Sequence, residues 1–316
     1  MKLVFCGTPR FAVPTLEALH RAGHEIALAV TQPDRPVGRS QELQAPPVKQ
    51  TAMSLGIPVT QPDRIRNNDE FRALLESVKP DAIVVVAYGR IIPPWMLAVP
   101  RLGCINLHAS LLPRYRGAAP IQWAIAMGEE ITGNTTMLLE EGLDTGPILM
   151  QQALIIRPEQ TALDLFEEMA VGGAPLVVAT LDGLANRTLT PRPQDHSRAT
   201  MAPLLNREDG RISFAAHTAT QIRNRWRGFQ PWPGAFTALE GRNLIAHKLD
   251  AVNGSQIDAP GSLDPAQVFI RDERILVACA GGTWLELLEL QLEGKKRLCA
   301  SEFLRGTPLA TGTRLG

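Results

Sequence analysis

Residues 81–88 read Asp-Ala-Ile-Val-Val-Val-Ala-Tyr, and this apolar run constrains the fold more than any other segment of the chain. A strand with one face in solvent alternates apolar and polar side chains, and this run does not alternate. A strand that is apolar on both faces is typical of a parallel sheet with helices on both sides. The run therefore predicts the central strand of an α/β domain.

Strand-like and helix-like segments alternate on both sides of this run. Apolar segments predict strands at residues 2–6, 25–31 and 57–60, and the segments between them predict helices at 14–21, 48–55 and 69–78. Strands separated by helix-length segments imply βαβ units. We therefore expect residues 1–189 to form an α/β domain with a Rossmann-like, mostly parallel sheet. Near its end, residues 161–184 predict a helix that breaks at Gly172 and Gly173.

The chain changes character after residue 189. Residues 190–206 are polar and contain three prolines, which predicts a linker between domains. From residue 207 to residue 316 short strand patterns return, separated by Asn-Gly and Gly-Gly turns. This part predicts a small β-rich domain that is consistent with a barrel.

Composition argues against several kinds of protein. The 316 residues include 32 basic and 32 acidic side chains, so no global field attracts nucleic acid or a membrane. The four cysteines form no C-x-x-C pair, which argues against a disulfide framework or a zinc site and fits a reducing compartment. We see no leader before the first strand and no apolar run that approaches about 18 residues, so we expect a cytoplasmic protein.

A second strand-like segment, residues 104–108, carries the first candidate catalytic residues. Alternate side chains of a strand face the same way, so Asn106 and His108 project together. An amide can donate a hydrogen bond to an oxyanion, and an imidazole can pass a proton near neutral pH. Asp144 lies in a turn between two predicted strands, from which it could orient the imidazole. These residue types suit acyl transfer to an amine, and the same pattern also fits a structural asparagine and histidine.

Two other segments are candidate binding regions. Residues 32–47 form a long polar loop that contains Arg39, which is typical of a lid or binding arm, or of a disordered surface loop. Arginine and aromatic residues interleave in residues 211–236, where Arg223, Arg225 and Arg227 are candidates for phosphate contacts. The alternative for this second segment is a solvated helix whose tryptophans lie in the core.

Several motifs of the chain occur together in one known family. The longest runs from Asn106-Leu-His108 through Ser110-Leu-Leu-Pro113 to Gly117, and Leu143-Asp-Thr-Gly146 follows it later. The shorter motifs are Phe5-Cys-Gly-Thr-Pro9, Thr31-Gln-Pro-Asp-Arg-Pro36, Pro231-Trp-Pro-Gly-Ala235 and Gly306-Thr-Pro-Leu-Ala-Thr-Gly312. On these motifs the chain resembles the formyltetrahydrofolate-dependent formyltransferases, essentially from end to end.

The resemblance implies a reaction and the residues that perform it. The formyl donor would be 10-formyltetrahydrofolate, and the acceptor would be the amino group of initiator methionyl-tRNA. Asn106, His108 and Asp144 would carry the catalysis without a metal. The folate site would include Ser110, Leu111, Leu112, Pro113, Tyr88, Gly89, Arg90, Ile91 and Ile92.

The resemblance also implies how tRNA is held, by a protein that we expect to be a monomer. The second domain would be an OB-like β-barrel that binds tRNA through Arg223, Arg225 and Arg227. The 32–47 loop would contact the acceptor arm through Arg39, but this chain reads Arg-Ser-Gln-Glu at residues 39–42, where the family usually carries further lysines. Because phosphate contacts make binding salt-dependent, we expect a shallow salt slope for tRNA affinity.

Other functions stay open on the sequence. Two use the same chemistry: formylation of an amino-sugar nucleotide, and hydrolysis of formyltetrahydrofolate. A third is a non-catalytic RNA-binding protein built on an inactive enzyme. A fourth is a nicotinamide-dependent oxidoreductase, against which the sequence argues, because residues 7–9 do not match the G-x-G-x-x-G fingerprint.

Overall fold

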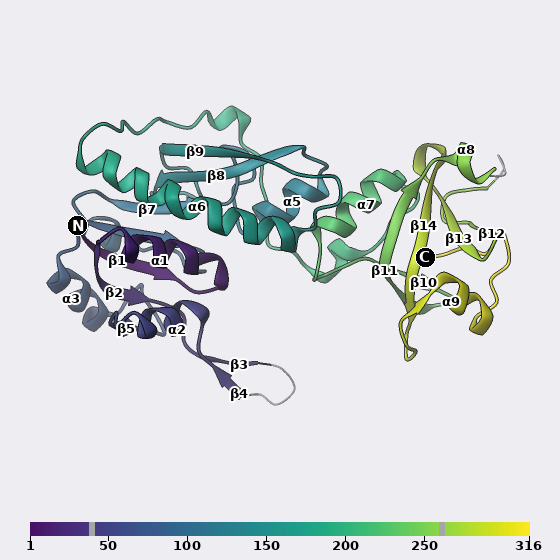
Figure 1. Cartoon of the computed structure of the whole chain (residues 1–316), viewed down its shortest axis with the longest axis horizontal. Helices are drawn as coiled ribbons and strands as arrows, with labels where there is room; N and C mark the ends of the chain where they lie inside the picture. The colour runs from purple at the N-terminus through teal and green to yellow at the C-terminus, as the bar shows by residue number, and fades with distance from the viewer. Residues whose placement is uncertain (38–41, 259–262) are drawn as a thin grey trace. The chain divides into compact units, whose positions relative to one another are not determined.

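The computed structural model describes residues 1–37, 42–258 and 263–316, which form two compact units (Figure 1). Unit 1 comprises Met1–Pro120, Ile131–Ile155 and Asp164–Pro203, and unit 2 comprises Ile121–Glu130, Ile156–Leu163 and Leu204–Gly316. Most of the segment that we predicted as a linker, up to Pro203, therefore packs within unit 1. Unit 2 also takes two short segments that lie earlier in the sequence, between parts of unit 1.

Unit 1 is built on a seven-stranded sheet with the order β5-β2-β1-β6-β7-β8-β9. Its strands are β1 (Lys2–Gly7), β2 (Glu25–Val30), β5 (Val59–Thr60), β6 (Ala82–Val86), β7 (Cys104–His108), β8 (Ile131–Leu138) and β9 (Ile148–Ile155). The pairs from β5 to β7 are parallel, whereas β7–β8 and β8–β9 are antiparallel. The prediction of a Rossmann-like, mostly parallel sheet is confirmed.

β6 lies at the centre of this sheet, as its apolar run predicts. It pairs with β1 on one side and with β7 on the other. Every residue of β6 is buried, and Val85 is the most exposed of them at 5%. Because neighbouring parallel strands end at the same edge of a sheet, the loops that follow β6 and β7 leave side by side.

Helices flank the sheet at most of the predicted places. They are α1 (Val13–Arg21), α2 (Pro47–Ser54), α3 (Asp69–Val78), α4 (Pro94–Leu97) and α6 (Ala162–Ala185). The predicted break in the last of these helices is wrong, because α6 continues through Gly172 and Gly173. A Cβ atom on Gly173 would lie 2.6 Å from Cδ2 of Leu107 in β7. The glycine therefore admits a side chain of β7 rather than ending the helix.

The 32–47 segment is partly a β-hairpin rather than a plain loop. β3 (Arg35–Val37) pairs antiparallel with β4 (Glu42–Gln44), and the residues between them, including Arg39, lie outside the described part of the chain. The hairpin is anchored at its base, where Lys49 Nζ and Gln61 Nε2 donate to the Asp34 carboxylate at 2.8 and 2.7 Å. Its role as a lid or binding arm stays a prediction.

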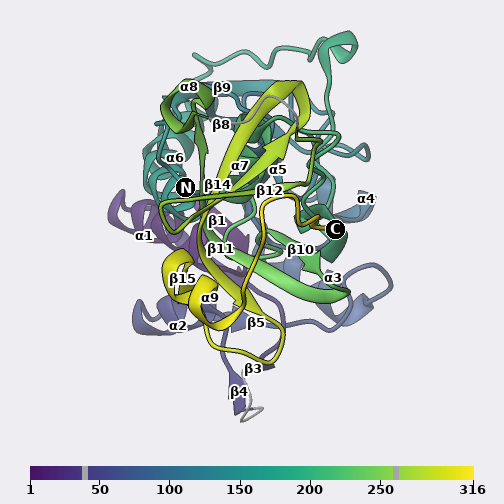
Figure 2. The ribbon, with the colours of Figure 1, turned by 90° about the vertical axis from the view of Figure 1, so that its right-hand side faces the viewer.

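Unit 2 contains an antiparallel sheet with the order β10-β11-β14-β13-β12, beside which β15 pairs with β14 (Figure 2). Its strands are β10 (Phe236–Leu239), β11 (Arg242–Val252), β12 (Val268–Arg271), β13 (Arg274–Cys279), β14 (Thr283–Leu292) and β15 (Leu298–Cys299). The other α-helices of the described residues are α5 (Pro120–Ala126), α7 (Ala219–Gly228), α8 (Gly254–Ile257) and α9 (Ala300–Gly306). The prediction of a β-rich second domain is confirmed.

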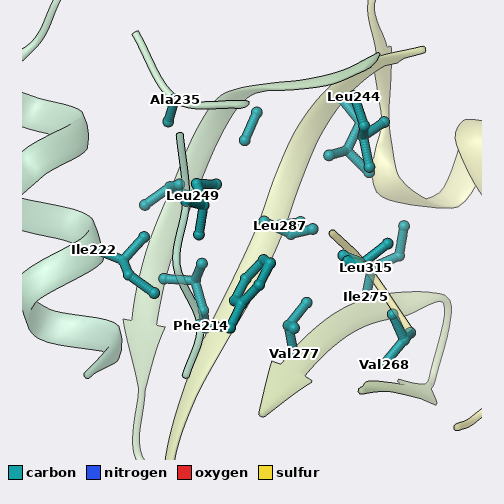
Figure 3. Packing of buried hydrophobic residues seen from close by; sticks show 14 of the residues in the cluster. Phe214, Ile222, Ala235, Leu244, Leu249, Val268, Ile275, Val277, Leu287 and Leu315 are labelled. Carbon is teal, nitrogen blue, oxygen red and sulfur yellow. The ribbon is translucent and has the colours of Figure 1, made fainter. Parts of the chain in front are cut away.

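The core of unit 2 joins α7 to this sheet. Ile222 of α7 points toward Phe214 and Leu249 among the buried side chains of the cluster (Figure 3). At its other end α7 approaches α5 closely, because a Cβ atom on Gly228 would lie 2.6 Å from the Gln122 carbonyl oxygen. Of the helices that the structure describes, none has the length and apolar character needed to cross a membrane.

Candidate active site

Asn106 and His108 lie on β7, and the pairing of β7 with its neighbours fixes their direction. Val85 of β6 is the register partner of Asn106, and Thr135 of β8 is the partner of His108. Because alternate side chains of a strand share a face, Asn106 and His108 project from the same side of the sheet. Leu107 takes the opposite side, where it contacts α6. The carboxamide and the imidazole therefore lie on one face of β7, while α6 packs against the opposite face.

Asp144 approaches His108 because the chain doubles back. β8 ends at Leu138 beside Ile105, which lies toward the end of β7 away from His108. β9 begins beside Met137, at that same end, so the connecting residues 139–147 extend toward His108 and come back before β9 begins. This connection brings Asp144 Oδ2 to 3.7 Å from His108 Nδ1, with both side chains largely buried. The imidazole and the carboxylate therefore lie together, although 36 positions separate them in the sequence.

Three consecutive residues, numbers 115 to 117, hold both groups. Nε2 of His108 lies 2.9 Å from the Tyr115 carbonyl oxygen. A carbonyl can only accept, so Nε2 carries a hydrogen and Nδ1 faces the carboxylate. The backbone N–H of Gly117 donates to Asp144 Oδ2 over 2.8 Å. Sequence reasoning missed Tyr115 and Gly117 as functional residues, because both contacts use backbone groups that no side-chain pattern marks.

Two polar groups of this site have no hydrogen-bond partner among the described residues. Within the residues that the structure describes, no group hydrogen-bonds to the Asn106 carboxamide, and Oδ1 of Asp144 is also without a bond. The Asn106 side chain is only half-buried, so water or a ligand can reach it. The site therefore offers an amide donor and a carboxylate acceptor near the same imidazole.

Cys104 begins the same strand but does not add a nucleophile to the site. Its side chain is 2% exposed, and its thiol donates to the Met96 carbonyl oxygen at 3.6 Å. Burial raises the pKa of the Cys104 thiol to about 12. Because the thiolate is the reactive form of cysteine, a thiol that stays protonated near neutral pH is inert.

The predicted folate residues Ser110, Leu111, Leu112 and Pro113 form the loop that follows β7. Thr135 Oγ1 donates to the Ser110 carbonyl at 2.6 Å and accepts from the Leu112 N–H at 3.1 Å. Leu112 is buried, whereas Leu111 and Pro113 are partly exposed. One hydroxyl on β8 therefore fixes the loop, and Leu111 and Pro113 are the side chains that a ligand can touch.

The Tyr88 side chain, which we predicted for the folate site, points into the core of unit 1. It is 2% exposed, packs with Cys6 and Met96, and has no hydrogen-bond partner for its hydroxyl in the described residues. Burial raises the pKa of this hydroxyl well above its ordinary value. Only the backbone of Tyr88 is therefore available near the loop.

The other predicted residues of this loop differ in what they expose. Gln32, which sequence reasoning missed, donates from Nε2 to the carbonyls of Tyr88 at 3.1 Å and Gly89 at 3.2 Å. Arg90 donates to the Asp63 carbonyl, and Ile92 is buried. Ile91, in contrast, is 88% exposed. A large apolar side chain in water beside a polar site suits contact with the flat ring of a ligand.

Arg227, one of the predicted tRNA contacts, is committed to the interior of unit 2. It is 5% exposed and donates to the Gln160 carbonyl at 2.8 Å and to Asn224 Oδ1 at 2.7 Å. Burial, and then the neighbouring Arg223, lower the pKa of this guanidinium. A side chain this buried is poorly placed to contact a tRNA phosphate directly. Its hydrogen bonds instead join parts of unit 2 to one another.

The neighbouring arginines are also engaged, but less completely. Arg223 Nε lies 2.6 Å from Asp250 Oδ1 and its side chain is 25% exposed. Arg225 donates to the Asp209 carbonyl and lies 4.9 Å from the centre of the Phe229 ring. The structure thus leaves Arg223 and Arg225 partly accessible, and their contact with tRNA stays a prediction.

Comparison with known proteins gives the chain a family context. A family model described as formyl transferase matches residues 1–181, and a second described as formyl transferase, C-terminal domain, matches residues 204–308. The methionyl-tRNA formyltransferase of Acidobacterium capsulatum is 60% identical over 316 residues, which cover 100% of both chains. That of Koribacter versatilis is 53% identical over 316 residues, which are 100% of this chain and 99% of that one.

A solved structure shares the fold at much lower identity. It is an N-formyltransferase from Helicobacter canadensis in complex with folinic acid and dTDP-3-aminofucose. The TM-score is 0.65 at 18% identity, and the match covers 91% of this chain and 98% of that one. The similarity extends over both units taken in sequence, so the two-part architecture is shared.

Proposed function

We propose that this chain, which belongs to the formyl transferase family, moves the formyl group of 10-formyltetrahydrofolate to the α-amino group of methionyl-tRNA. The observation that carries the proposal is the approach of the Asp144 carboxylate to His108, beside an Asn106 amide that no described residue binds. The relatives that match along the whole chain support the tRNA acceptor over an amino-sugar nucleotide. Such a reaction belongs to translation and therefore to the cytoplasm, where we propose that the chain acts as a monomer.

The residues of the site fit a formyl-transfer transition state. As the amine adds to the formyl carbon, negative charge develops on the formyl oxygen and positive charge on the nitrogen. The Asn106 amide donates to that oxygen, and a protonated His108 supplies positive charge beside it. With Nε2–H donating to the Tyr115 carbonyl, the second ring proton sits on Nδ1, on the side of Asp144.

Asp144 handles the proton that the amine must lose. Its Oδ2 accepts from Gly117 and faces the imidazole, so Oδ1 is the oxygen that can take a proton from the attacking nitrogen. The new C–N bond forms, the bond from the formyl carbon to the folate nitrogen breaks, and the proton taken from the amine passes to that nitrogen. No net redox change occurs, and the carboxylate and imidazole return to their starting states.

The folate would lie between two loops of unit 1. The β6 loop offers the exposed Ile91, and the β7 loop offers Leu111 and Pro113. Apolar side chains with a few fixed polar groups are the usual lining of a site for a flat heterocycle. Both loops emerge at neighbouring strand ends, which would bring the formyl carbon to the side of the sheet that carries Asn106.

For the tRNA we propose contacts from Arg39, Arg223 and Arg225. The partial exposure of Arg223 supports its part in the proposal, and the position of Arg39 outside the described residues leaves it resting on the sequence alone. Arg227 is removed from the set because of its burial. An alanine variant of each remaining arginine should raise the KM for tRNA and leave the KM for the formyl donor unchanged.

The test of the proposed function is transfer of labelled formyl from 10-formyltetrahydrofolate. Three parallel reactions contain methionyl-tRNA, a dTDP-linked amino sugar, or no acceptor. We expect labelled methionyl-tRNA, little labelled sugar and little free formate, with the transfer lost in His108→Ala. Preferential labelling of the sugar would overturn the tRNA acceptor, and rapid formate release without an acceptor would make the protein a hydrolase.

A further inference from the structure

Gln194 lies in the segment that the sequence predicts as a linker. Its side-chain amide hydrogen-bonds to residues 139–147, the connection between β8 and β9 that carries Asp144. Its Nε2 donates to the carbonyl oxygens of Asp144 at 2.9 Å and Gly146 at 2.7 Å. The side chain is 6% exposed, so these bonds are shielded from water. Both hydrogens of one amide are therefore used on the backbone of the connection on either side of Thr145.

The other end of the same amide is held by Arg116. The Oε1 atom of Gln194 accepts from Arg116 Nη2 at 2.6 Å and from Arg116 Nε at 3.2 Å. Arg116 is also 6% exposed, and its Nη2 lies 3.1 Å from His196 Nδ1, which must accept this bond. The amide thus bridges an arginine on one loop and two carbonyls on another.

Arg116 stands between the two residues whose backbones hold the catalytic pair. Tyr115 accepts from His108, and Gly117 donates to Asp144. The chain of contacts therefore closes on itself: imidazole, loop 115–117, guanidinium, Gln194 amide, Asp144 backbone and Asp144 carboxylate. The residues of this ring are joined by hydrogen bonds, apart from the covalent chain within residues 115–117 and within Asp144 and the 3.7 Å approach of Asp144 Oδ2 to His108 Nδ1.

The segment around Gln194 is fixed to this ring along its backbone. Arg116 donates to the Thr200 carbonyl at 2.8 Å and accepts from the Ala202 N–H at 2.7 Å, while Thr200 Oγ1 accepts from the Tyr115 N–H at 2.9 Å. Residue 117 must be glycine here, because a Cβ atom would lie 2.6 Å from the Ala202 carbonyl oxygen. Residues 194–202 therefore brace the loop that holds the imidazole.

Asp144 needs this support because its backbone is in an unfavourable region. Its φ of +51° lies in the left-handed region that side chains with a Cβ rarely adopt, although aspartate tolerates it better than most. Contacts from the surrounding structure have to maintain such a conformation. The Gln194 amide accounts for two of them, at the Asp144 carbonyl and two residues later.

We propose that Gln194, held by Arg116, is a positioning residue for the formyl-transfer reaction, because it fixes the backbone that sets Asp144 against His108. It touches neither substrate and acts only through Asp144. The inference rests on the proposed function, whose reaction it serves. By analogy with the residues that orient metal ligands, whose loss typically costs about 10- to 100-fold in activity, we expect an effect in this range.

The variant Gln194→Glu separates the two ends of the amide. A carboxylate keeps the acceptors for Arg116 and gains an ion pair with it, but it loses both N–H donors to the carbonyls. We expect kcat to fall about 10-fold, while the KM values for methionyl-tRNA and formyl donor stay within about 2-fold, as a loss restricted to the transition state requires. Arg116→Lys, which cannot span both contacts with Oε1, should show the same pattern to a smaller degree.

Gln160→Glu is the matched control in unit 2. Gln160 is also a buried glutamine, 3% exposed, and its Oε1 accepts from the Arg157 N–H at 2.8 Å. This change should lower thermal stability by an amount comparable to that of Gln194→Glu, yet leave kcat within about 2-fold. A fall of kcat in both variants in proportion to stability would mean that Gln194 is merely structural.

A readout that needs no turnover keeps this test separate from the proposed function. In the full-length protein labelled with ¹⁵N-histidine, the ring signals of His108, assigned by comparison with His108→Gln, should shift in Gln194→Glu and stay in place in Gln160→Glu. An inactive wild-type protein would overturn the proposed function while the His108 shift still supports the link. An active wild type with an unchanged kcat and unchanged His108 signals in Gln194→Glu would overturn the positioning role.

Discussion

β7 of unit 1 and α7 of unit 2 both carry polar side chains in a pattern that suggests a site, and the structure treats them oppositely. On β7, Asn106 keeps an amide without a partner among the described residues. On α7, Arg223, Arg225 and Arg227 all contact groups of unit 2. On β7 the Asn106 amide stays available to a ligand, whereas on α7 most of the guanidinium groups are bonded within the fold.

The difference comes from what each pattern fixes. A strand repeats every two residues, so an N-x-H spacing sets the direction of both side chains before any tertiary contact forms. A run of arginines on a helix sets only the face, because each guanidinium is long and can turn to whatever acceptor lies near. Backbone carbonyls near the ends of neighbouring elements, such as the Gln160 carbonyl, can accept from these arginines, and no sequence pattern predicts which carbonyls will do so.

The largest effect that we expect is the loss of the Asp144 carboxylate. Asp144→Asn keeps the size of the side chain, but the amide cannot take the proton of the amine or balance a charged imidazole. We expect kcat to fall about 10³-fold, within the range of general acid–base contributions, with little change in the KM for tRNA. Single-turnover transfer of labelled formyl measures the chemical step.

His108→Gln is the companion variant for this experiment. If Asp144 acts through the imidazole as well as on the amine, the double variant should lose little more than the worse single variant. If the rate losses of the two single variants multiply in the double variant, the two groups act independently. The short distance between Asp144 and His108 would then not matter for the reaction.

The second effect is the loss of the free amide on β7. Asn106→Ala removes the proposed donor to the developing oxyanion, which should cost about 10²- to 10³-fold in kcat. The Asn106 side chain is half-buried and makes no hydrogen bond to a described residue, so its removal strands no polar partner and should leave the melting temperature within about 2 °C of the wild type. A large loss of stability would mean that the amide is structural after all.

Much of unit 1 follows from the sequence, and the reason is local. The unbroken apolar run of β6 and the alternation of strands and helices specify a parallel sheet with few competing arrangements. The break predicted in α6 failed because glycine has two uses, as a helix stop and as a close-packing position. Gly173 is a close-packing position because Leu107 of the facing strand lies against it, and the sequence does not show that contact.

The sequence indicated the side chains of the candidate site, but not the backbone groups that contact them. The motifs around Asn106, His108 and Asp144 indicate those residues, but nothing in a one-dimensional pattern shows that Tyr115 and Gly117 contribute a carbonyl and an N–H. Gln194 was hidden for a similar reason, since prolines on either side of it suggested a linker. Burial of a glutamine within such a segment is visible only once the fold is known.

The third effect tests the other half of the comparison. Arg227→Met keeps much of the apolar stem of the arginine but strands the Gln160 carbonyl and Asn224, which should destabilise unit 2 by about 2–4 kcal/mol. Urea denaturation followed by tryptophan fluorescence measures the change, because Trp123 and Trp226 both lie in unit 2. At a temperature where the variant stays folded, its KM for tRNA should match that of the wild type.

The smallest effect concerns the arginines that remain partly exposed. Arg223→Ala frees Asp250, whose carboxylate then repels phosphate, so the KM for tRNA should rise about 3-fold at low salt and by less near physiological salt.

The same measurement on the wild type across salt concentrations gives the number of phosphate contacts, since each contributes a slope of about 0.7 to 0.9 in a plot of log affinity against log salt. With one basic residue among residues 39–42 and most of the α7 arginines paired, the slope should correspond to fewer than about six contacts. A steeper slope would show that a basic surface other than α7 holds the tRNA. The α7 arginines would then be bonded within the protein because tRNA binds elsewhere, and not because a helical run of arginines leaves their direction open.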